Sequence, residues 1–457
     1  MNLRLADVAL WTRGTVRGAD VAVNGVFSDT RTPVAGALFV AISGETFDAH
    51  DFIAQAKSGG AAAALVARPV AVDLPQVVVA DTLQALGDLA SAVRAQSGAR
   101  VAGITGSNGK TTVKTLLASI LARHGRTHVN AGNFNNEIGL PLSILAMPAD
   151  TEYAVFEMGA GKPGDIAYLA AIARPEIGLV NNIAPAHLER MGSLEGIAET
   201  KGALYAALPA HGVAVINADD AFAPMFTGQA GGRRVLAFGL DHAAPVRAQI
   251  RALAAHSRFL LVTPLGEVDV DLPLAGRHNV LNALAASAMA LALDVPLDAI
   301  KAGLESAPAV AGRLLRHLMP GGWTLIDDSY NANPGSAAAA IATLAIEPGE
   351  HWLVLGDMRE LGAQADELHA GIGALARAQG VARLYAVGDL SAHAAAAFGD
   401  GARHFPDQAA LIGTLAADVR AGVTLLVKGS RGSAMERVVH ALQGAANGDN
   451  GGKRHVA

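Results

Sequence analysis

The stretch VAGITGSNGKTT, residues 101–112, joins an apolar run to a loop of small residues and then to Lys110. The apolar run is typical of a buried strand. The apolar residues after Thr112 recur at helical spacing, and Gly125 predicts where that helix ends. A strand, a tight loop and a helix in this order aim backbone N–H groups and the positive helix end at one point. The stretch therefore predicts a phosphate-binding loop, formed by Thr105, Gly106, Ser107, Asn108, Gly109, Lys110, Thr111 and Thr112.

The loop departs from the pattern G-x-x-x-x-G-K-[ST] in one position. The residue five places before Gly109 is Ile104, and Gly103 comes one residue too early. Because G-K-[ST] alone is common by chance, a polar turn with no ligand is the alternative. The strand, loop and helix order favours a nucleotide-binding loop of a variant kind.

Composition narrows the class of protein. The chain has 457 residues, no cysteine and a net charge of −6. This length predicts two or three domains. The absence of cysteine excludes disulfides, thiolate zinc sites and a cysteine nucleophile. With no basic run, no apolar stretch of membrane-spanning length and no secretory pattern at the start, we expect a soluble cytoplasmic protein that does not bind nucleic acid.

The pattern of apolar runs predicts an α/β fold in several units. Residues 1–98 alternate short strands with small helices, and from residue 99 bounded apolar runs typical of parallel strands alternate with helices. The alternation restarts after residue 312, which predicts a second doubly wound unit over 313–445. The tail, 446–457, is expected to be disordered.

Polar residues follow several predicted strands, at the edge where open α/β sheets bind ligands. Glu157 ends one strand, His187 follows the next, and Lys201 lies in the helix after it. Singly, each is explained as ordinary polar surface. Together with a triphosphate loop, they favour metal-assisted phosphoryl transfer.

The C-terminal half repeats this pattern. Asn279 and Asn282 share one face of a helix, where they could read an adenine edge or simply be satisfied by burial. The string DDSYNANPGS, residues 327–336, ends a strand with a polar cluster larger than a turn needs. Lys428 and Arg431 lie in a Gly/Ser turn before a helix, which suits an anionic substrate.

These motifs together resemble the Mur ligases, the ATP-dependent amide-forming enzymes of peptidoglycan precursor synthesis. The resemblance covers nearly the whole chain, and the family's own nucleotide loop also lacks the first glycine. It rests on SDTRTPVAGALFVAISGETFDAHDF, GITGSNGKTT, NFNNEIGLPLSIL, FEMGAGKPGDI, NNIAPAHLERMGSLEGIAETKG, GRHNVLNALAA, DDSYNANPGS, LGDMRELG and KGSRGSAME.

The resemblance implies three domains: a small α/β domain over 1–98 that holds the UDP end of the substrate, a central P-loop ATPase-like domain with a parallel sheet over 99–312, and a Rossmann-like C-terminal domain. It implies ATP and Mg²⁺ as cofactors, with Lys110 and Thr111 on the phosphates. Its expected metal ligands are Thr111, Glu157, His187 and Lys201, the last as a carbamate. Its catalytic residues would be Lys110, Lys201 and His187.

Further roles follow from the same resemblance. The nucleotide would also be contacted by Asn279, Arg313, Asp327 and Tyr330. The UDP-linked substrate would be contacted by Ser28, Asp29, Thr30, Arg31, Asn133, Asn135 and Asn136. The acceptor side would hold Asn331, Asn333, Lys428 and Arg431.

At DDSYNANP the chain most resembles the dipeptide-adding members of the family, so the resemblance implies D-alanyl-D-alanine as the amine, joined through an acyl phosphate to UDP-N-acetylmuramoyl-tripeptide. We expect a monomeric enzyme. Two alternatives are a ligase of this superfamily that adds a single amino acid and a folylpolyglutamate synthetase. A nucleotide-switched binding protein is an alternative from another class.

Overall fold

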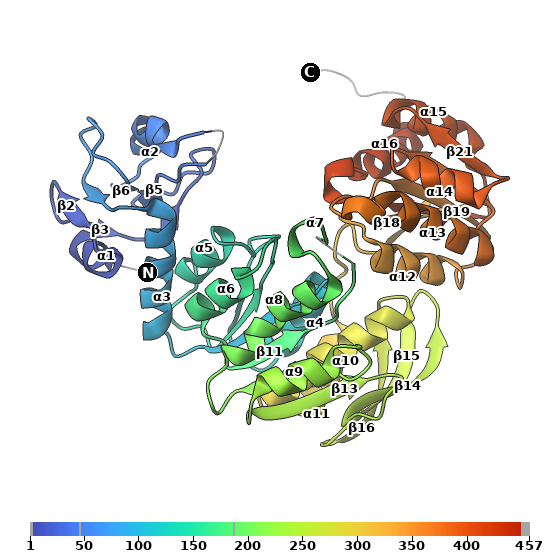
Figure 1. Cartoon of the computed structure of the whole chain (residues 1–457), viewed down its shortest axis with the longest axis horizontal. Coiled ribbons are helices and arrows are strands. Elements are labelled where there is room, and N and C mark those ends of the chain that lie inside the picture. The colour runs from blue at the N-terminus through green and yellow to red at the C-terminus, as the bar shows by residue number, and fades with distance from the viewer. Residues whose placement is uncertain (1–2, 45–46, 186–187, 449–457) are drawn as a thin grey trace, which may run out of the picture.

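The computed structural model describes residues 3–44, 47–185 and 188–448, with side chains up to residue 444. Three α/β units follow one another along the chain, and the central one contacts the other two (Figure 1). This confirms the predicted three-domain α/β fold. The domain boundaries after residues 98 and 312 stay predictions; they fall between α3 and β8 and between α11 and β17.

The described part of the N-terminal unit contains a five-stranded sheet in the order β2-β7-β6-β5-β4. Helix α3 packs against α5 and α6 and so attaches this unit to the central one (Figure 1). The elements are β1 (Leu3–Arg4), α1 (Leu5–Thr12), β2 (Thr15–Arg17), β3 (Ala22–Val23), β4 (Val26–Phe27), β5 (Leu38–Val40), η1 (Ala49–Phe52), α2 (Ile53–Ser58), β6 (Ala63–Val66), β7 (Gln76–Val78) and α3 (Thr82–Gln96).

The central unit is built on a sheet in the order β16-β15-β14-β13-β12-β11-β8-β10-β9. Its neighbours run parallel from β9 to β14, and β14, β15 and β16 pair antiparallel. Strand β8 lies between β10 and β11, so the direction of winding reverses at β8, and ligands of open α/β sheets bind at such a point.

The bounds of these strands and of the helices between them are β8 (Arg100–Thr105), α4 (Lys110–Leu121), β9 (Thr127–Val129), α5 (Gly139–Leu145), β10 (Tyr153–Glu157), α6 (Asp165–Ala173), β11 (Ile177–Val180), α7 (Leu188–Met191), α8 (Leu194–Ala206), β12 (Val213–Asn217), α9 (Ala223–Ala230), β13 (Arg234–Gly239), β14 (Val246–Leu253), β15 (Ser257–Thr263), β16 (Gly266–Leu272), α10 (Arg277–Ala292) and α11 (Leu297–Glu305). Helix α4 ends at Leu121, four residues before the predicted end at Gly125. Ala122 caps the helix, and residues 122–124 form a turn that leads to Gly125.

The C-terminal unit has a sheet in the order β17-β18-β22-β19-β20-β21, parallel except for β17. Alternate residues of its strands face two helical layers: Ile326 and Leu353 pack with α12, α13 and α14, whereas Leu325 and Val354 pack with α15 and α16. This is the doubly wound arrangement that the sequence predicts.

Its elements are β17 (Leu315–Met319), β18 (Trp323–Asp328), α12 (Pro334–Leu344), β19 (Glu350–Gly356), η2 (Gly362–Gln364), α13 (Ala365–Ala378), β20 (Arg383–Val387), α14 (Ser391–Phe398), β21 (Ala402–Phe405), α15 (Gln408–Asp418), β22 (Val423–Lys428), η3 (Arg431–Ser433) and α16 (Glu436–Gly448). Helix α16 continues three residues into the tail predicted to be disordered from residue 446. The rest of that tail lies outside the described residues.

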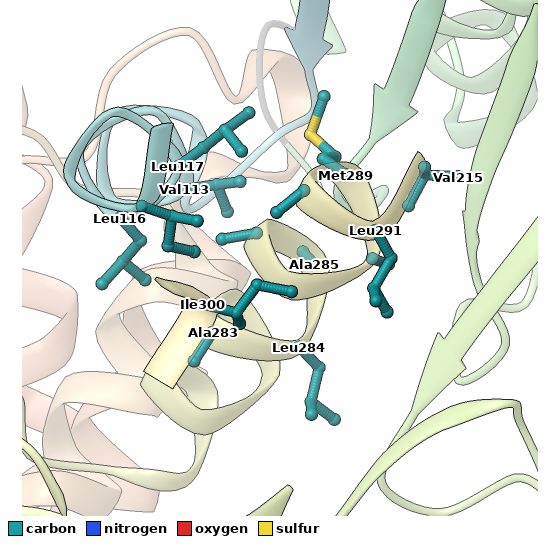
Figure 2. Close-up of a cluster of buried hydrophobic side chains, with 14 of the residues drawn as sticks. Val113, Leu116, Leu117, Val215, Ala283, Leu284, Ala285, Met289, Leu291 and Ile300 are labelled. Carbon is teal, nitrogen blue, oxygen red and sulfur yellow. The ribbon is translucent and has the colours of Figure 1, made fainter. Parts of the chain in front are cut away.

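The core of the central unit fixes the helix that carries the phosphate loop. Helix α10 is buried along almost its whole length and packs against α4, while α11 covers α4 from another side. Figure 2 shows Val113 and Leu117 of α4 beside Ala285 and Met289 of α10. Because α4 is held by two helices as well as by the sheet, its N-terminal end has one fixed position.

The contact between α11 and α4 supplies a test. A Cβ at Gly303 would lie 2.4 Å from the Cα of Ile120, and backbone cannot rotate away. We expect Gly303→Ala to lower the free energy of unfolding by about 1–3 kcal/mol, as overpacking does. Gly371→Ala in α13, where the new methyl would meet no atom within 4 Å, is the control and should raise stability by about 0.4–1 kcal/mol. Urea denaturation measures both; equal effects would show that α11 does not press on α4 as described.

Candidate active site

The phosphate loop follows β8 and requires glycine at two positions. Gly106 and Gly109 have φ angles of +145° and +79°, which side chains with a Cβ rarely adopt. A Cβ at Gly109 would lie 2.4 Å from Oδ1 of Asn282 and 2.5 Å from Nδ2 of Asn181. The loop therefore forms only with glycine before Lys110.

Lys110 is the first residue of α4, and its Nζ donates to the carbonyl oxygen of Gly106 over 2.8 Å. Burial lowers the pKa of Lys110; the nearby Glu157 carboxylate opposes this shift and Arg313 adds to it. The ammonium group thus lies at the inner side of the loop, where an anion would relieve the cost of its burial.

Glu157 is the buried carboxylate opposite the loop. Its Oε2 accepts from the Thr111 hydroxyl over 2.9 Å, and its Oε1 accepts from Nδ2 of Asn135 over 2.8 Å. Burial raises the pKa of Glu157, but the charges of Lys110 and Lys114 outweigh it and the pKa is lowered. The carboxylate is therefore ionised at neutral pH.

Two residues that the sequence did not single out hold Glu157 in place. Lys114 lies 3.3 Å from its Oε2 and donates to the carbonyl oxygens of Asn130 and Gly132 over 2.9 and 3.1 Å. The Asn130 side chain accepts from the backbone N–H of Glu157 and donates to its carbonyl oxygen, over 2.9 and 3.0 Å. The end of β10 is thus tied to the loop that follows β9.

Lys201 lies in α8, and only 2% of the residue is exposed. Burial, and then the charge of Lys110, lower the pKa of Lys201 well below its ordinary value, while Asp165 opposes the shift. The neutral amine is therefore easier to form at Lys201 than at a solvated lysine. His187, the third predicted metal ligand, lies outside the described residues. Within the described part of the chain, no cluster of three or more His, Asp or Glu side chains forms a ready metal site.

The C-terminal unit faces the phosphate loop across the same space. Asn333 caps α12 by accepting from the N–H of Ser336, and its Nδ2 donates to Oδ1 of Asn108 over 2.8 Å. The guanidinium carbon of Arg313 lies 4.4 Å from the centre of the Tyr330 ring, and that of Arg431 lies 5.6 Å from it. The hydrogen bond from Asn333 to Asn108 therefore connects the two units at the loop, and the stack on Tyr330 stands on the C-terminal side of the space.

A cavity of about 430 Å³ lies where these groups converge. It is lined by most of the residues that the sequence predicts for the site: Ser107, Asn108, Gly109, Lys110, Thr111, Asn133, Asn135, Asn136, Glu157, Lys201, Arg313, Tyr330, Asn331, Asn333 and Arg431. Several charged or polar residues that the sequence did not single out also line it, namely Glu137, Lys162, Asp165, Tyr168, Arg190 and Ser336. Lys162 and Asp165 stand in the motif GAGKPGD after β10, so their place at a strand end was the available indication.

The remaining described residues that the sequence predicts for the site do not line the large cavity. Thr112 and Asn279 line a small neighbouring cavity with Arg313. Thr105 and Gly106 belong to the loop but not to the cavity lining, and Asp327 accepts from the backbone and hydroxyl of Ser329. The stretch Ser28, Asp29, Thr30 and Arg31 follows β4 in the N-terminal unit, where Arg31 pairs with Asp29 and lowers the pKa of Asp29 to about 2.

Lys428 does not line the cavity, although the sequence suggests that it holds an anion. It is 2% exposed, and its Nζ lies 2.5 Å from Oδ2 of Asp328 and 3.0 Å from the carbonyl oxygen of Asn331. Burial lowers the pKa of Lys428 and raises the pKa of Asp328, and each partner's charge opposes the other's shift. Lys428 therefore fixes the turn that presents Asn331.

Three family models match the chain in order: the Mur ligase family, catalytic domain at residues 22–94, the Mur ligase middle domain at 104–290, and the Mur ligase, glutamate ligase domain at 312–431. The UDP-N-acetylmuramoyl-tripeptide–D-alanyl-D-alanine ligase of Escherichia coli (strain K12) is 47% identical over 447 residues, which cover 97% of this chain and 99% of that one. The Bacillus subtilis (strain 168) ligase of the same name is 35% identical and covers 96% and 97%.

Solved structures of MurF match this chain over nearly its whole length. A crystal structure of MurF from Acinetobacter baumannii matches with a TM-score of 0.92 and 35% identity over 97% of this chain and 99% of that chain. MurF ligase from Thermotoga maritima, solved in complex with ADP, matches with a TM-score of 0.83 and 28% identity over 93% and 99%.

The pair formed by Lys428 and Asp328 can be tested by stability. Lys428→Met leaves the Asp328 carboxylate buried without its partner, and we expect a loss of about 3–5 kcal/mol. Asp328→Asn combined with Lys428→Met should recover most of it. Lys57→Met, which removes an exposed pair with Asp73, is the control and should cost at most about 1 kcal/mol. Chemical denaturation distinguishes these cases; a loss at Lys428 as small as at Lys57 would contradict the structural role.

Proposed function

The chain belongs to the Mur ligase family, and we propose that it joins D-alanyl-D-alanine to UDP-N-acetylmuramoyl-tripeptide with ATP, releasing ADP and phosphate. The single observation that carries the proposal is the cavity in which the phosphate loop of the central unit faces the polar strand end of the C-terminal unit. The names of the relatives support the substrates, and the ADP in the Thermotoga structure supports the nucleotide.

The geometry suits activation of a carboxylate. A carboxylate is a poor acyl donor because its leaving group would be oxide, so it first attacks the γ-phosphorus of ATP and ADP leaves. The acyl phosphate that forms can then be attacked by the amine, which loses a proton as phosphate departs. Lys110 lies at the loop, where its ammonium group would offset the charge on the transferring oxygens.

The described residues fit a hard divalent cation. The Thr111 hydroxyl and the Glu157 carboxylate bring oxygen donors within 2.9 Å of each other at the loop, and Mg²⁺ prefers oxygen ligands. When bound, Mg²⁺ would supply charge neutralisation at the phosphates. The expected roles of Glu157 and Thr111 as its ligands are part of this proposal, as is that of His187.

We propose that the amine of Lys201 is carbamylated by carbon dioxide. An amine reacts with carbon dioxide only in its neutral form, and burial beside Lys110 favours that form. The resulting anion would lie among cationic groups, which stabilise it. Asp165, whose charge opposes the loss of the ammonium form, lines the same cavity.

We assign the acceptor amine to the C-terminal side of the cavity, which Asn331, Asn333 and Arg431 line. We assign its carboxylate to Arg431, which lines the cavity, whereas Lys428 is buried and engaged by Asp328. The UDP end is assigned to the N-terminal unit around Ser28 and Thr30, with Asn133, Asn135 and Asn136 toward the peptide. A cytoplasmic location and a monomeric state remain expectations; within the described residues, no helix is long and apolar enough to cross a membrane.

The acceptor is tested directly. Phosphate release with ATP and UDP-N-acetylmuramoyl-tripeptide should depend on D-alanyl-D-alanine and should be weak with D-alanine, lysine or meso-diaminopimelate. A site that pairs the internal amide of a dipeptide leaves polar groups without partners when a single amino acid binds. Equal rates with a single amino acid would remove the dipeptide assignment, and ATP turnover without any UDP-linked substrate would favour the nucleotide-switch alternative.

The carbamate is tested at Lys201. Lys201→Ala should lose at least about a hundredfold in ligation rate, as loss of a preorganised charge does, and short carboxylates added to the assay should restore part of it by occupying the vacated space. Lys301→Ala, at a half-buried lysine of α11 that does not line the large cavity, is the control and should ligate at the parent rate. Near-parent activity of Lys201→Ala would mean that this lysine only fills space.

A further inference from the structure

A second cavity, of about 260 Å³, lies between the central and C-terminal units. Asn279 of α10 and the apolar side chains of Leu274 and Ile326 form part of its wall. Glu347, in the turn after α12, also lines it. Helix α12 runs close to the start of α10, since a Cβ at Gly276 would lie 2.6 Å from Oγ1 of Thr343. The cavity thus combines apolar walls with one acidic side chain.

The Glu347 carboxylate is buried, and one of its oxygens lacks a donor. Its side chain is 3% exposed, and within the described residues Oε2 has no hydrogen-bond partner. The guanidinium of Arg316 lies 3.6 Å away, which gives charge compensation but no hydrogen bond. Buried acceptors are almost always paired in native proteins, so an unpaired one that lines a cavity indicates a missing donor.

This cavity continues toward the phosphate loop. Arg313 lines it and also lines the large cavity that contains Lys110. Asn279 and Arg313 both line the small cavity between them, which Thr112 of α4 borders as well. A molecule whose phosphates lie at the loop can therefore extend past Arg313 toward Glu347.

We propose that Glu347 accepts a hydrogen bond from the 6-amino group of adenine and thereby selects ATP over purine nucleotides that lack this group. The proposal rests on the proposed use of ATP and adds the residue that reads the base. Leu274 and Ile326 suit the faces of a purine ring, while the carboxylate Oε2 suits only a donor at its edge. A 6-oxo purine would direct a carbonyl oxygen at the carboxylate, and an unsubstituted purine would leave the carboxylate unpaired.

The test compares three nucleoside diphosphates by calorimetry: ADP, IDP and purine riboside diphosphate. The parent protein should bind ADP about tenfold to a hundredfold more tightly than either of the others, as expected for a hydrogen bond to a charged group. Glu347→Gln should reduce the ADP-to-IDP ratio about tenfold, because its amide can turn its NH₂ group toward a 6-oxo group. It should reduce the ratio of ADP to purine riboside diphosphate less, because the amide oxygen can still accept from the 6-amino group, although without the charge. Glu305→Gln, at a half-buried ion pair on α11 that does not line this cavity, is the control and should keep the parent ratios.

Ratios within one protein are unaffected by a general loss of stability. Equal affinity of the parent for ADP and purine riboside diphosphate would overturn the assignment even if Glu347→Gln failed to fold. A uniform loss for all three nucleotides in Glu347→Gln would also overturn it and would leave Glu347 as the ion-pair partner of Arg316. Failure of the parent to bind any nucleotide would instead overturn the proposed use of ATP, and the two failures are therefore distinguishable.

Discussion

The space at residue 109, which admits no Cβ, is the constraint on which the site depends. Asn181 donates from one amide nitrogen to the carbonyl oxygen of Asn108 and to Oδ1 of Asn282, over 2.9 and 3.0 Å, and these side chains fill the space beside Gly109. The same contacts join the loop to the end of β11 and to α10. The geometry of the loop is therefore set by the core of the central unit, because α10 is buried within that core.

Charge burial explains why this loop suits an anionic ligand. Lys110 and Lys114 lie close to one buried carboxylate, Glu157, and burial lowers the pKa of Lys110. Unpaired ammonium groups away from water are costly. An anionic ligand removes that cost. Because the buried lysines outnumber the carboxylate beside them, the loop should bind phosphate more strongly than a solvated surface would.

The sequence predicted what local patterns determine and missed what tertiary contacts determine. The strand, loop and helix around Lys110 and the parallel strands came from periodicity, and most strand-end polar residues do line one cavity. Strand β14, whose sequence VRAQIRAL alternates apolar and polar residues, lacks the bounded apolar run from which the parallel strands were predicted. The pairing of Lys428 with Asp328 could not be predicted because only the fold brings the two together, and Glu347 gave no indication because a lone glutamate after a helix is ordinary. The roles of individual residues stay predictions.

Helix α12 relates the two ends of the nucleotide site. Asn333 at its start donates to Asn108 of the phosphate loop, and Ser336 in its first turn lines the large cavity. The N-terminus of a helix favours negative charge, so this end suits phosphates. Eleven helical residues span about 16 Å, and the turn beyond them presents Glu347. Because one rigid helix carries both contacts, a movement of the C-terminal unit would change the phosphate side and the base side together.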